Sequence, residues 1–318
     1  MPAASYGFAN TRGLGSAMSR HWFQLAERGT ATTLLMIRWI ALHIGRRAGR
    51  FLLFPITFYY LFMAPVARRG SKTYLRRVLG RRPSYLDVFR HFHCFAATIL
   101  DRVYFRCGRL DRFDIHVYND EILFEEVRAA RGCILLGAHL GSFDVLRALA
   151  LSLDKVPLKI LMDKAHNATI TRVLDELNPE FADSIIPIGG PETLLKVNEY
   201  LKQGFLIGAL GDRVVSTDRT TRCQFLGKEA SFPAGPMLLA CALRAPVMLV
   251  FGLYRGGVRY DVYFECLSKQ VTVGPERRLE EARRLTQRYA ERLEHYVKLA
   301  PYNWFNFYDY WDESVSRT

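Results

Sequence analysis

One histidine in the sequence has the neighbours that a general base needs. His139 begins the segment His-Leu-Gly-Ser-Phe-Asp, which places the carboxylate of Asp144 five residues after the imidazole. An imidazole can take a proton from a hydroxyl group, and a carboxylate one helical turn away can fix its tautomer and stabilise the imidazolium. The spacing alone is not specific, because His116 and Glu121 repeat it. The elements around each histidine must therefore decide between the two pairs.

The two histidines differ in those elements. His139 follows the apolar run 133–138, which predicts a buried strand, and Ser142 begins a predicted helix. Enzymes with α/β folds bind their ligands beyond the carboxyl ends of strands. The other histidine lies within a polar strand with no helix start beside it. We therefore predict that His139 is a general base oriented by Asp144, with Ser142 near the substrate. The alternative is a structural histidine beside a capped helix.

Two further segments lie at equivalent places in the predicted fold. Gly211, Asp212 and Arg213 follow the apolar run 204–210, so they also project from the carboxyl end of a strand. A guanidinium there can hold a phosphate or an oxyanion, and the alternative is a structural ion pair. Another predicted helix begins near Gly235, and its free N–H groups could bind an anion, unless the segment is only a well-formed helix start.

No other catalytic motif is complete. The sequence has no Gly-x-Ser-x-Gly nucleophile elbow, no Gly-x-Gly-x-x-Gly loop after a strand and no Walker loop. His91 and His93 precede Cys94, but on a helix the two histidines point to different faces, so we expect no metal site there. The six cysteines include no C-x-x-C pair, which indicates a reducing compartment without disulfides. We therefore expect no metal and no cofactor.

The body of the chain alternates between strand-like and helical segments. Several of the strands are continuous apolar runs, as expected when helices cover both faces of a sheet. This alternation predicts an α/β fold with a mostly parallel sheet, in which the last strand runs antiparallel after a turn at residues 255–257. The predicted strands are 112–118, 133–138, 156–161, 184–188, 204–210, 246–254 and 257–267. The predicted helices lie near 142–153, 167–178, 191–202, 235–244 and 275–299, the last with an apolar stripe of Leu279, Leu285, Tyr289, Leu293 and Tyr296.

The positive charge of the protein is concentrated in its N-terminal part, residues 1–90. The chain has 44 Lys and Arg against 31 Asp and Glu, and residues 1–90 hold 15 of the former and two of the latter. With 50% hydrophobic and 24% charged residues, the composition excludes a disordered chain, a collagen-like repeat and a polytopic membrane protein. A basic N-terminal part indicates an anionic partner: membrane phospholipid, nucleic acid or an acidic protein. Nucleic acid is disfavoured, because the nearby aromatic residues form solid apolar blocks rather than single stacking platforms.

Two apolar blocks in this N-terminal part, 31–45 and 51–67, favour a membrane surface as the anionic partner. The second has 17 uncharged residues, about 25 Å as a helix, which is less than the roughly 30 Å hydrocarbon core. Pro55 and Pro65 disfavour a straight span, and the arginines at both ends would force one cluster across the bilayer. We predict helices dipped into one leaflet with Arg and Lys on the headgroups, and a single short span is the alternative.

A run of basic residues follows the second apolar block. On a helix, Arg68, Lys72 and Arg76 share one face, and Arg77 lies beside them. This face could contact lipid headgroups or dock an acidic protein. Together these patterns predict three regions: a peripheral or poorly structured segment 1–30, membrane-docking helices over 31–90 and an α/β domain over 91–318.

Several of these segments occur together in one known order. They are His139 to Asp144 after a buried strand, Gly211-Asp-Arg213, Phe225-Leu-Gly227, Phe232-Pro-Ala-Gly-Pro236 and Pro301-Tyr-Asn-Trp-Phe-Asn-Phe-Tyr308, preceded by a membrane-seeking N-terminus. In this combination the chain resembles the lipid A biosynthesis late acyltransferase family, within the wider H-x4-D/E glycerolipid acyltransferases. The resemblance extends from about residue 20 to residue 311.

The resemblance implies metal-free acyl transfer on the cytoplasmic face of a bacterial inner membrane. His139 would deprotonate a hydroxyl or amine of a membrane lipid or glycolipid, which attacks an acyl thioester, and Asp144 would orient His139. Asp212 and Arg213 would shape the acceptor or oxyanion site. The donor would be acyl carrier protein or acyl-CoA, and the acidic carrier protein would suit the basic residues 68–82.

One block departs from the pattern of the family. Lipid A enzymes usually close with aromatic residues among His and Arg, whereas residues 304–311 read WFNFYDYW. In this respect the chain is similar to the branch found with aryl-polyene and polyketide-like clusters, in which the acyl group or the acceptor differs. These aromatic residues can also be core or interfacial anchors. The alternatives to acyl transfer are a non-catalytic lipid-binding or assembly protein of the same fold and a hydrolase of acyl thioesters.

Overall fold

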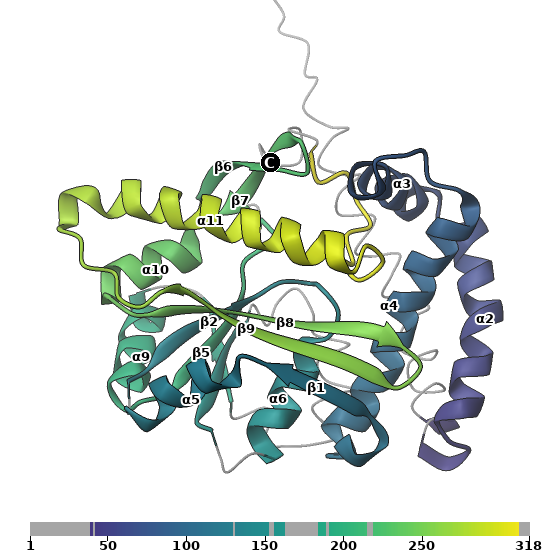
Figure 1. Ribbon diagram of the computed structural model, residues 1–318, viewed down its shortest axis with the longest axis horizontal. Coiled ribbons are helices and arrows are strands. Elements are labelled where there is room, and N and C mark those ends of the chain that lie inside the picture. The colour runs from purple at the N-terminus through teal and green to yellow at the C-terminus, as the bar shows by residue number, and fades with distance from the viewer. Residues whose placement is uncertain are drawn as a thin grey trace, which may run out of the picture.

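In the computed structural model, the described residues form a seven-stranded central sheet in the order β1-β9-β8-β2-β5-β3-β4 (Figure 1). All neighbouring strands are parallel except β8 and β9. The strands are β1 (Asp114–Tyr118), β2 (Cys133–Gly137), β3 (Leu158–Met162), β4 (Ile185–Pro187), β5 (Leu206–Leu210), β8 (Val247–Gly256) and β9 (Arg259–Ser268). The predicted mostly parallel sheet is confirmed, and each of its strands corresponds to a predicted one with ends that differ by a few residues.

Both faces of the sheet are buried, which explains the continuous apolar runs of its central strands. Along β2, Ile134 and Leu136 face one side while Cys133 and Leu135 face the other, because side chains alternate along a strand. The helices α10 (Gly235–Leu243) and α11 (Arg278–Leu299) cover the first side, and α9 (Pro191–Lys202) packs beside β4 and β5. On the second side lie α5 (Asp120–Arg128) and α6 (Phe143–Ser152) (Figure 1). Helices therefore cover both faces, as predicted.

The hairpin of β8 and β9 reverses the direction of the sheet. Gly256 and Gly257 form its turn with φ angles of 104° and 56°, a region of backbone conformation that glycine favours. The predicted antiparallel last strand is thereby confirmed. Because β1 pairs parallel with β9, these two strands run opposite to the other five. Only those five strands end at the edge of the sheet that carries His139.

The structure also contains elements that the sequence patterns did not predict. The strands β6 (Thr220–Phe225) and β7 (Lys228–Pro233) form a separate antiparallel hairpin. The helix α4 (Tyr85–Arg106) begins with a reciprocal capping box between Ser84 and Asp87, and the predicted domain boundary at residue 90 falls inside it. The apolar stripe of α11 is buried as predicted except at Leu279, which is 47% exposed because it lies near the free end of the helix.

The structure describes residues 39–311 except 41, 130, 153–155, 163–183, 189–190 and 215–218. The predicted peripheral segment 1–30, most of the apolar block 31–45 and the predicted helix near 167–178 lie outside the described residues. The second apolar block is described. It forms α2 (Arg46–Met63) and the start of α3 (Pro65–Leu79), and the two helices meet at an angle of 94°.

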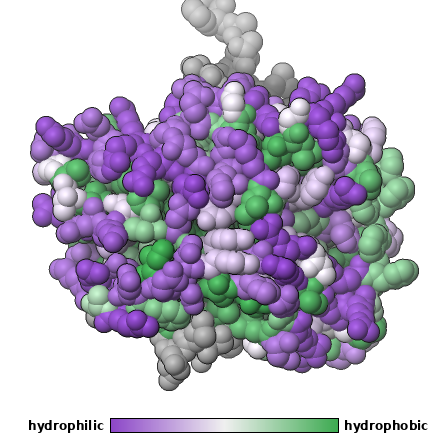
Figure 2. Space-filling view, viewed as in Figure 1, coloured by the Kyte–Doolittle hydropathy of each residue, from purple (hydrophilic) through white to green (hydrophobic). Residues whose placement is uncertain are grey.

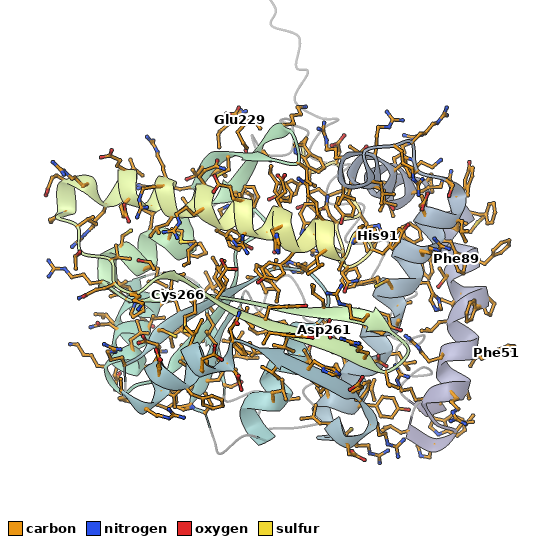
Figure 3. The ribbon with its side chains drawn as sticks, in the orientation of Figure 1. Phe51, Phe89, His91, Glu229, Asp261 and Cys266 are labelled. Atoms are coloured by element: carbon orange, nitrogen blue, oxygen red, sulfur yellow. The ribbon has the colours of Figure 1, made fainter. Side chains whose placement is uncertain are left out.

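One side of α2 presents large apolar residues to the surroundings. Within the described part of the chain, no single helix has the length and hydropathy to cross a membrane, whereas the bent pair of α2 and α3 has them when counted together. Hydrophobic side chains gather on the side of the molecule where α2 lies (Figure 2), and Phe51 points away from the body (Figure 3). The exposed apolar side chains of this surface are Phe51, Phe54, Phe58, Tyr59, Tyr60, Phe62, Met63 and Val66.

Candidate active site

The pairing of β2 with β5 brings His139 and Asp212 together. Gly137 at the end of β2 is in register with Leu210 at the end of β5. His139 and Asp212 each lie two residues beyond this last pair. Because the strands are parallel and adjacent, both residues leave the sheet at the same edge. Two segments that the sequence predicted separately are therefore parts of one site.

The imidazole of His139 is hydrogen bonded to a buried carboxylate. Nδ1 of His139 lies 2.8 Å from Oδ1 of Asp212, and the backbone N–H of His139 donates to both carboxylate oxygens at 3.0 Å. A carboxylate accepts, so Nδ1 carries the proton and Nε2 has the free lone pair. The side chain of Asp212 is 1% exposed and that of His139 is 29% exposed. Among the residues that the structure describes, Nε2 has no hydrogen-bond partner and so remains available to a substrate.

The surroundings set the protonation states that a general base requires. Burial of the imidazole and then the charge of Arg213 lower the pKa of His139 below its ordinary value of 6.5. For Asp212, burial opposes ionisation, but the contacts with His139, Arg213 and Trp304 outweigh it and lower the pKa of the carboxyl. At neutral pH the site therefore contains a neutral imidazole against a carboxylate.

Asp144 has a different position from the one that the sequence spacing predicted. Its carboxylate lies in the first turn of α6 and forms ion pairs with Arg102 at 2.6 Å and Arg106 at 3.3 Å, both on α4. The carboxylate that bonds the imidazole is Asp212. The spacing misled because a carboxylate at the start of a helix projects sideways from it, here toward the two guanidinium groups of α4, whereas the strand register aims Asp212 at the histidine.

The loop between β2 and α6 crosses close over β8. Gly141 has a φ of 66°, and a Cβ at this position would overlap the carbonyl oxygen of Gly252. The next N–H, that of Ser142, donates to the same carbonyl at 2.8 Å. The side chain of Ser142 is 1% exposed, and its hydroxyl has no partner among the described residues. The predicted contact of Ser142 with substrate stays a prediction.

Residues 303–305, which we call the strap, complete the site, and no sequence pattern predicted a role for them in it. The carbonyl of Asn303 accepts from the N–H of Gly141 at 2.8 Å, and the N–H of Phe305 donates to the carbonyl of His139 at 2.9 Å. The indole Nε1–H of Trp304 donates to Oδ2 of Asp212 at 2.8 Å. The only signal in the sequence was a tryptophan in a block that also resembled core anchors, so its bond to Asp212 could not be predicted.

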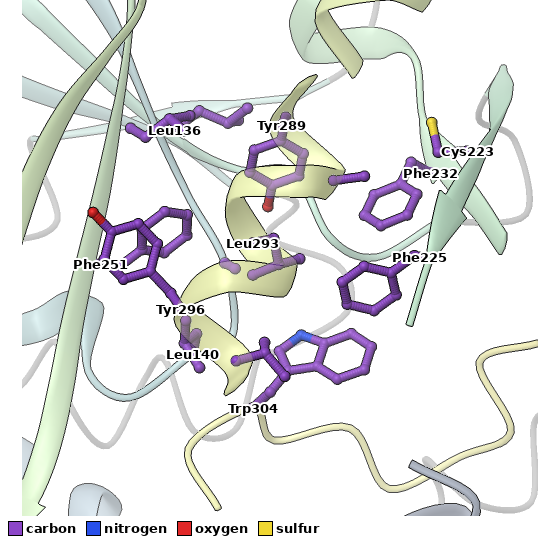
Figure 4. Close-up of a cluster of buried hydrophobic side chains, with 14 of the residues drawn as sticks. Leu136, Leu140, Cys223, Phe225, Phe232, Phe251, Tyr289, Leu293, Tyr296 and Trp304 are labelled. Atoms are coloured by element: carbon purple, nitrogen blue, oxygen red, sulfur yellow. The ribbon is translucent and has the colours of Figure 1, made fainter. Parts of the chain in front are cut away.

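Trp304 is also part of the aromatic core above the sheet. It is 1% exposed and packs edge-on against Tyr74 at a ring-centroid distance of 5.0 Å. It also packs edge-on against Phe225 at 5.2 Å (Figure 4). From α11, the hydroxyl of Tyr289 donates to the carbonyl of Gly137 at 2.9 Å. The end of β2 is thus held from the core side as well as by the strap.

The structure brings some of the other predicted site residues to His139. The N–H of Gly211 donates to the carbonyl of Gly137 at 3.1 Å, which joins the ends of β2 and β5. Nη2 of Arg213 donates to the carbonyl of Phe305 at 2.8 Å, so this guanidinium lies beside the strap. Gly235 begins α10, one residue before Pro236, and none of the described contacts of the His139 site involves it.

The four predicted docking residues of α3 do not form one free basic face. Arg68 donates to the carbonyls of the last turn of α2, and Lys72 lies 4.2 Å from the ring centroid of Tyr85. Arg77 lies over the ring of Trp311 at 4.6 Å. Arg76 is exposed. Packing within the protein therefore engages three of the four side chains, and Arg76 is the one that projects.

Three findings bear on what this site does. Among the described residues, no group of three or more His, Cys, Asp or Glu is placed to hold a metal ion. A family model described as bacterial lipid A biosynthesis acyltransferase matches residues 101–313. No curated protein matches the chain. The matched region includes α6, all seven strands of the sheet and the strap, and thus the hydrogen-bonded group of His139, Asp212 and Trp304.

Proposed function

The chain belongs to the bacterial lipid A biosynthesis acyltransferase family, and from this premise we propose that His139 is the general base of a membrane-bound acyl transfer. The family makes the protein an acyltransferase that acts on lipids. In our proposal the acyl group moves from a thioester donor to a hydroxyl or amine of a membrane lipid or glycolipid. The observation that carries the proposal is the pair of His139 and Asp212 at the ends of β2 and β5.

The proposed reaction follows from the free lone pair on Nε2 of His139. Nε2 takes the proton of the acceptor while the acceptor oxygen or nitrogen attacks the thioester carbonyl. The resulting imidazolium is stabilised by the ionised Asp212 at Nδ1. When the tetrahedral intermediate collapses, the carbon–sulfur bond breaks, and the imidazolium returns its proton to the departing thiolate. The products are the acylated lipid and a free thiol, and the imidazole is neutral again.

Arg213 suits the developing negative charge of this reaction. It lies close enough to His139 to lower the pKa of the imidazole, and its guanidinium is fixed on the carbonyl of Phe305. A guanidinium held in place before the reaction can stabilise an oxyanion without reorganisation. We assign Asp144 a supporting role, because its ion pairs with Arg102 and Arg106 tie the start of α6, and with it the loop from His139, to α4.

The exposed apolar side of α2 supports attachment to a membrane surface. Eight large apolar side chains of α2 and α3 lie open, and arginines occur at the start of α2 and along α3. A helix of this kind lies in the interface with its apolar face among the acyl chains. The proposed location is the cytoplasmic face of a bacterial inner membrane, with α2 dipped into the leaflet.

The proposed donor is acyl carrier protein, with acyl-CoA as the other thioester donor to test. Arg69, Arg76 and Arg82 are exposed on and just after α3, and an acidic carrier protein matches their charge. Residues 304–311, which lack the His and Arg usual in lipid A enzymes, favour an acceptor other than lipid A.

The test is a transfer assay with mass spectrometry. Purified protein is incubated with acyl carrier protein thioesters and a bacterial lipid extract, beside His139→Ala. A new acylated lipid that is missing with the variant supports the proposal and identifies the acceptor. Thioester hydrolysis without a new lipid would indicate a hydrolase. Lipid binding without turnover of carrier-protein or coenzyme A thioesters would indicate a non-catalytic protein.

A further inference from the structure

A series of hydrogen bonds, linked through the covalent bonds of Trp304, leads from α3 to the imidazole of His139. The hydroxyl of Ser71 on α3 lies 2.9 Å from Nδ1 of His91 on α4, and Nε2 of His91 lies 2.8 Å from the carbonyl oxygen of Trp304. The indole of Trp304 then donates to Asp212, which bonds His139. Ser71, His91, Trp304 and Asp212 are each no more than 1% exposed, so water does not compete for these bonds.

The direction of every bond in this series is fixed by chemistry. A carbonyl oxygen only accepts, so Nε2 of His91 carries the proton. Burial lowers the pKa of His91 to about 4, which leaves the ring neutral at physiological pH. Its Nδ1 is then an acceptor, and the hydroxyl of Ser71 donates to it. His91, which is labelled in Figure 3, therefore connects α3 to Trp304 in one defined tautomer.

Trp304 donates to Oδ2 of Asp212, the carboxylate oxygen that the ring of His139 does not contact. Oδ1 accepts from Nδ1 of His139 and Oδ2 accepts from the indole N–H, each at 2.8 Å. Rotation of the carboxylate would break one of these bonds inside a site that excludes water, where an unmade hydrogen bond is expensive. The indole N–H also withdraws charge from the carboxylate, which moderates how strongly Asp212 stabilises the imidazolium.

The helix α3 holds the strap in place by contacts on both sides of Trp304. The hydroxyl of Tyr74 donates to the carbonyl of Pro301 at 2.6 Å. A Cβ added at Gly70 would lie 2.5 Å from the backbone of Phe307 and Tyr308, so only glycine allows this approach. With His91 between them, these contacts leave the strap little freedom to move away from Asp212.

We propose that Trp304 and His91 are positioning residues of the acyl-transfer site: Trp304 fixes the carboxylate of Asp212, and His91 fixes Trp304 from α3. This inference rests on the proposed function, since it assigns the two residues to the same reaction. Neither residue touches the reacting atoms in this scheme. They act by keeping Nδ1 of His139 paired, and so keep its Nε2 directed at the acceptor.

The decisive variant is Trp304→Phe, which keeps an aromatic ring but removes the donor together with part of the ring volume. We expect kcat/KM to fall by about 10-fold to 100-fold, the usual effect of losing a hydrogen bond to a charged group. Without the indole N–H, the charge of Asp212 stabilises the imidazolium more strongly, so the pKa of His139 rises. The acid limb of the pH profile should therefore move to higher pH. The matched control is Trp311→Phe, which removes an indole donor to the carbonyl of Phe225 in the same aromatic core.

His91 is tested by comparing a conservative and a disruptive variant. His91→Gln can still present an N–H to the carbonyl of Trp304, and we expect it to retain most of the activity. His91→Leu cannot, and it should lose activity and shift the pH profile in the same direction as Trp304→Phe. His93→Leu on the same helix is the control, because His93 lies in contact with Phe54 and Phe89 rather than with the strap.

NMR titration of the His139 ring protons provides a readout that needs no turnover. A higher pKa of His139 in Trp304→Phe than in the wild type and Trp311→Phe supports the proposal even if no lipid is acylated, in which case only the proposed function fails. An unchanged His139 titration, or equal losses in Trp304→Phe and Trp311→Phe, would overturn it and leave Trp304 a core residue. If Trp304→Phe does not fold, as judged by thermal unfolding, the His91→Gln and His91→Leu pair decides by the same criteria.

Discussion

The replacement Asp212→Asn tests the site more sharply than removal of the histidine. The variant side chain has nearly the same shape but no charge, and one of its oxygens becomes an NH2 group. Asp212 accepts from three N–H groups, those of the His139 ring, the His139 backbone and the Trp304 indole. A carboxylate accepts hydrogen bonds at both oxygens, whereas the asparagine amide accepts only at its one oxygen. If its NH2 faces Nδ1 of His139, the imidazole must move its proton to Nε2, which removes the base.

The structure sets the magnitude of this effect. Opposite charges about 4 Å apart interact by about 4 kcal/mol at an effective dielectric of about 20, a value suited to a side chain that is 1% exposed. Loss of this stabilisation of the imidazolium in the transition state corresponds to a fall in kcat of about 10³-fold. The change in tautomer adds to the loss, so we expect a decrease of about 10³-fold to 10⁴-fold.

The assay compares initial rates of acyl transfer by three variants with that of the wild type. Asp144→Asn should lower the rate by about 10-fold or less and act mainly on stability, because it leaves Arg102 and Arg106 without their carboxylate. Asp261→Asn is the control for loss of a buried, ion-paired carboxylate that is not hydrogen bonded to His139, since Asp261 pairs with Arg255 and Arg259. Our assignment of the orienting carboxylate would be refuted if Asp212→Asn kept a tenth of the wild-type rate while the rate of Asp144→Asn fell 10³-fold.

Four other perturbations have expected outcomes. The rate profile of the wild type should be half-maximal below pH 6.5, because the pKa of His139 is lowered and the base must be neutral; a half-maximal rate above pH 6.5 would contradict this. The folded pKa of His91 is about 4 against 6.5 unfolded, so the unfolded state binds more protons between these values and stability falls as pH drops through this window, by on the order of 3 kcal/mol. In urea denaturation, the stability advantage of the wild type over His91→Gln should therefore shrink as the pH is lowered from 7 toward 4, and a constant difference would contradict the assignment. The double variant Phe51→Ser and Phe58→Ser should bind anionic vesicles at least 10-fold more weakly in sedimentation without a change in thermal unfolding, because each exposed ring contributes about 1.5–3 kcal/mol on burial; unchanged vesicle binding would show that α2 does not dip into the bilayer. Arg76→Glu should raise KM for the carrier-protein thioester at low salt with little change in kcat, and an equal KM would place the docking surface elsewhere.

The sequence patterns predicted the sheet well because both its faces are buried. A strand covered on both sides is a continuous apolar run, and the strands β2, β5 and β8 have this form. The hairpin of β6 and β7 was missed because it pairs outside the sheet and has alternating burial, which a search for continuous runs passes over. The helix α4 was missed although Ser84 and Asp87 have the spacing of a capping box.

The sequence patterns predicted His139 and Asp212 as residues of the site, but not that they contact each other. His139 and Asp212 were both placed at the ends of strands, and the choice of Asp144 as the partner came from distance along the chain. Which strands are neighbours decides the true partner, and β2 and β5 pair across about seventy residues of intervening sequence. Trp304 could not be found in this way, because its bond to Asp212 depends on a strap that belongs to no helix or strand and pairs only through an isolated bridge with Leu140.

If Trp304 positions Asp212 as proposed, a newly made chain completes its site only late in its synthesis. His91 and Trp304 are 213 residues apart in the sequence, and the bond between them closes over the site from the far end of the chain. A ribosome-bound chain that has already released β2 and β5 can pair His139 with Asp212, but it lacks the donor on the second carboxylate oxygen. Under the proposed function, a thioester donor would thus meet a finished site only after synthesis has passed residue 305, long after α2 and α3 have been made. The proposed attachment of α2 to a membrane would then precede catalytic competence, so that the first turnover would take place where a lipid acceptor is present.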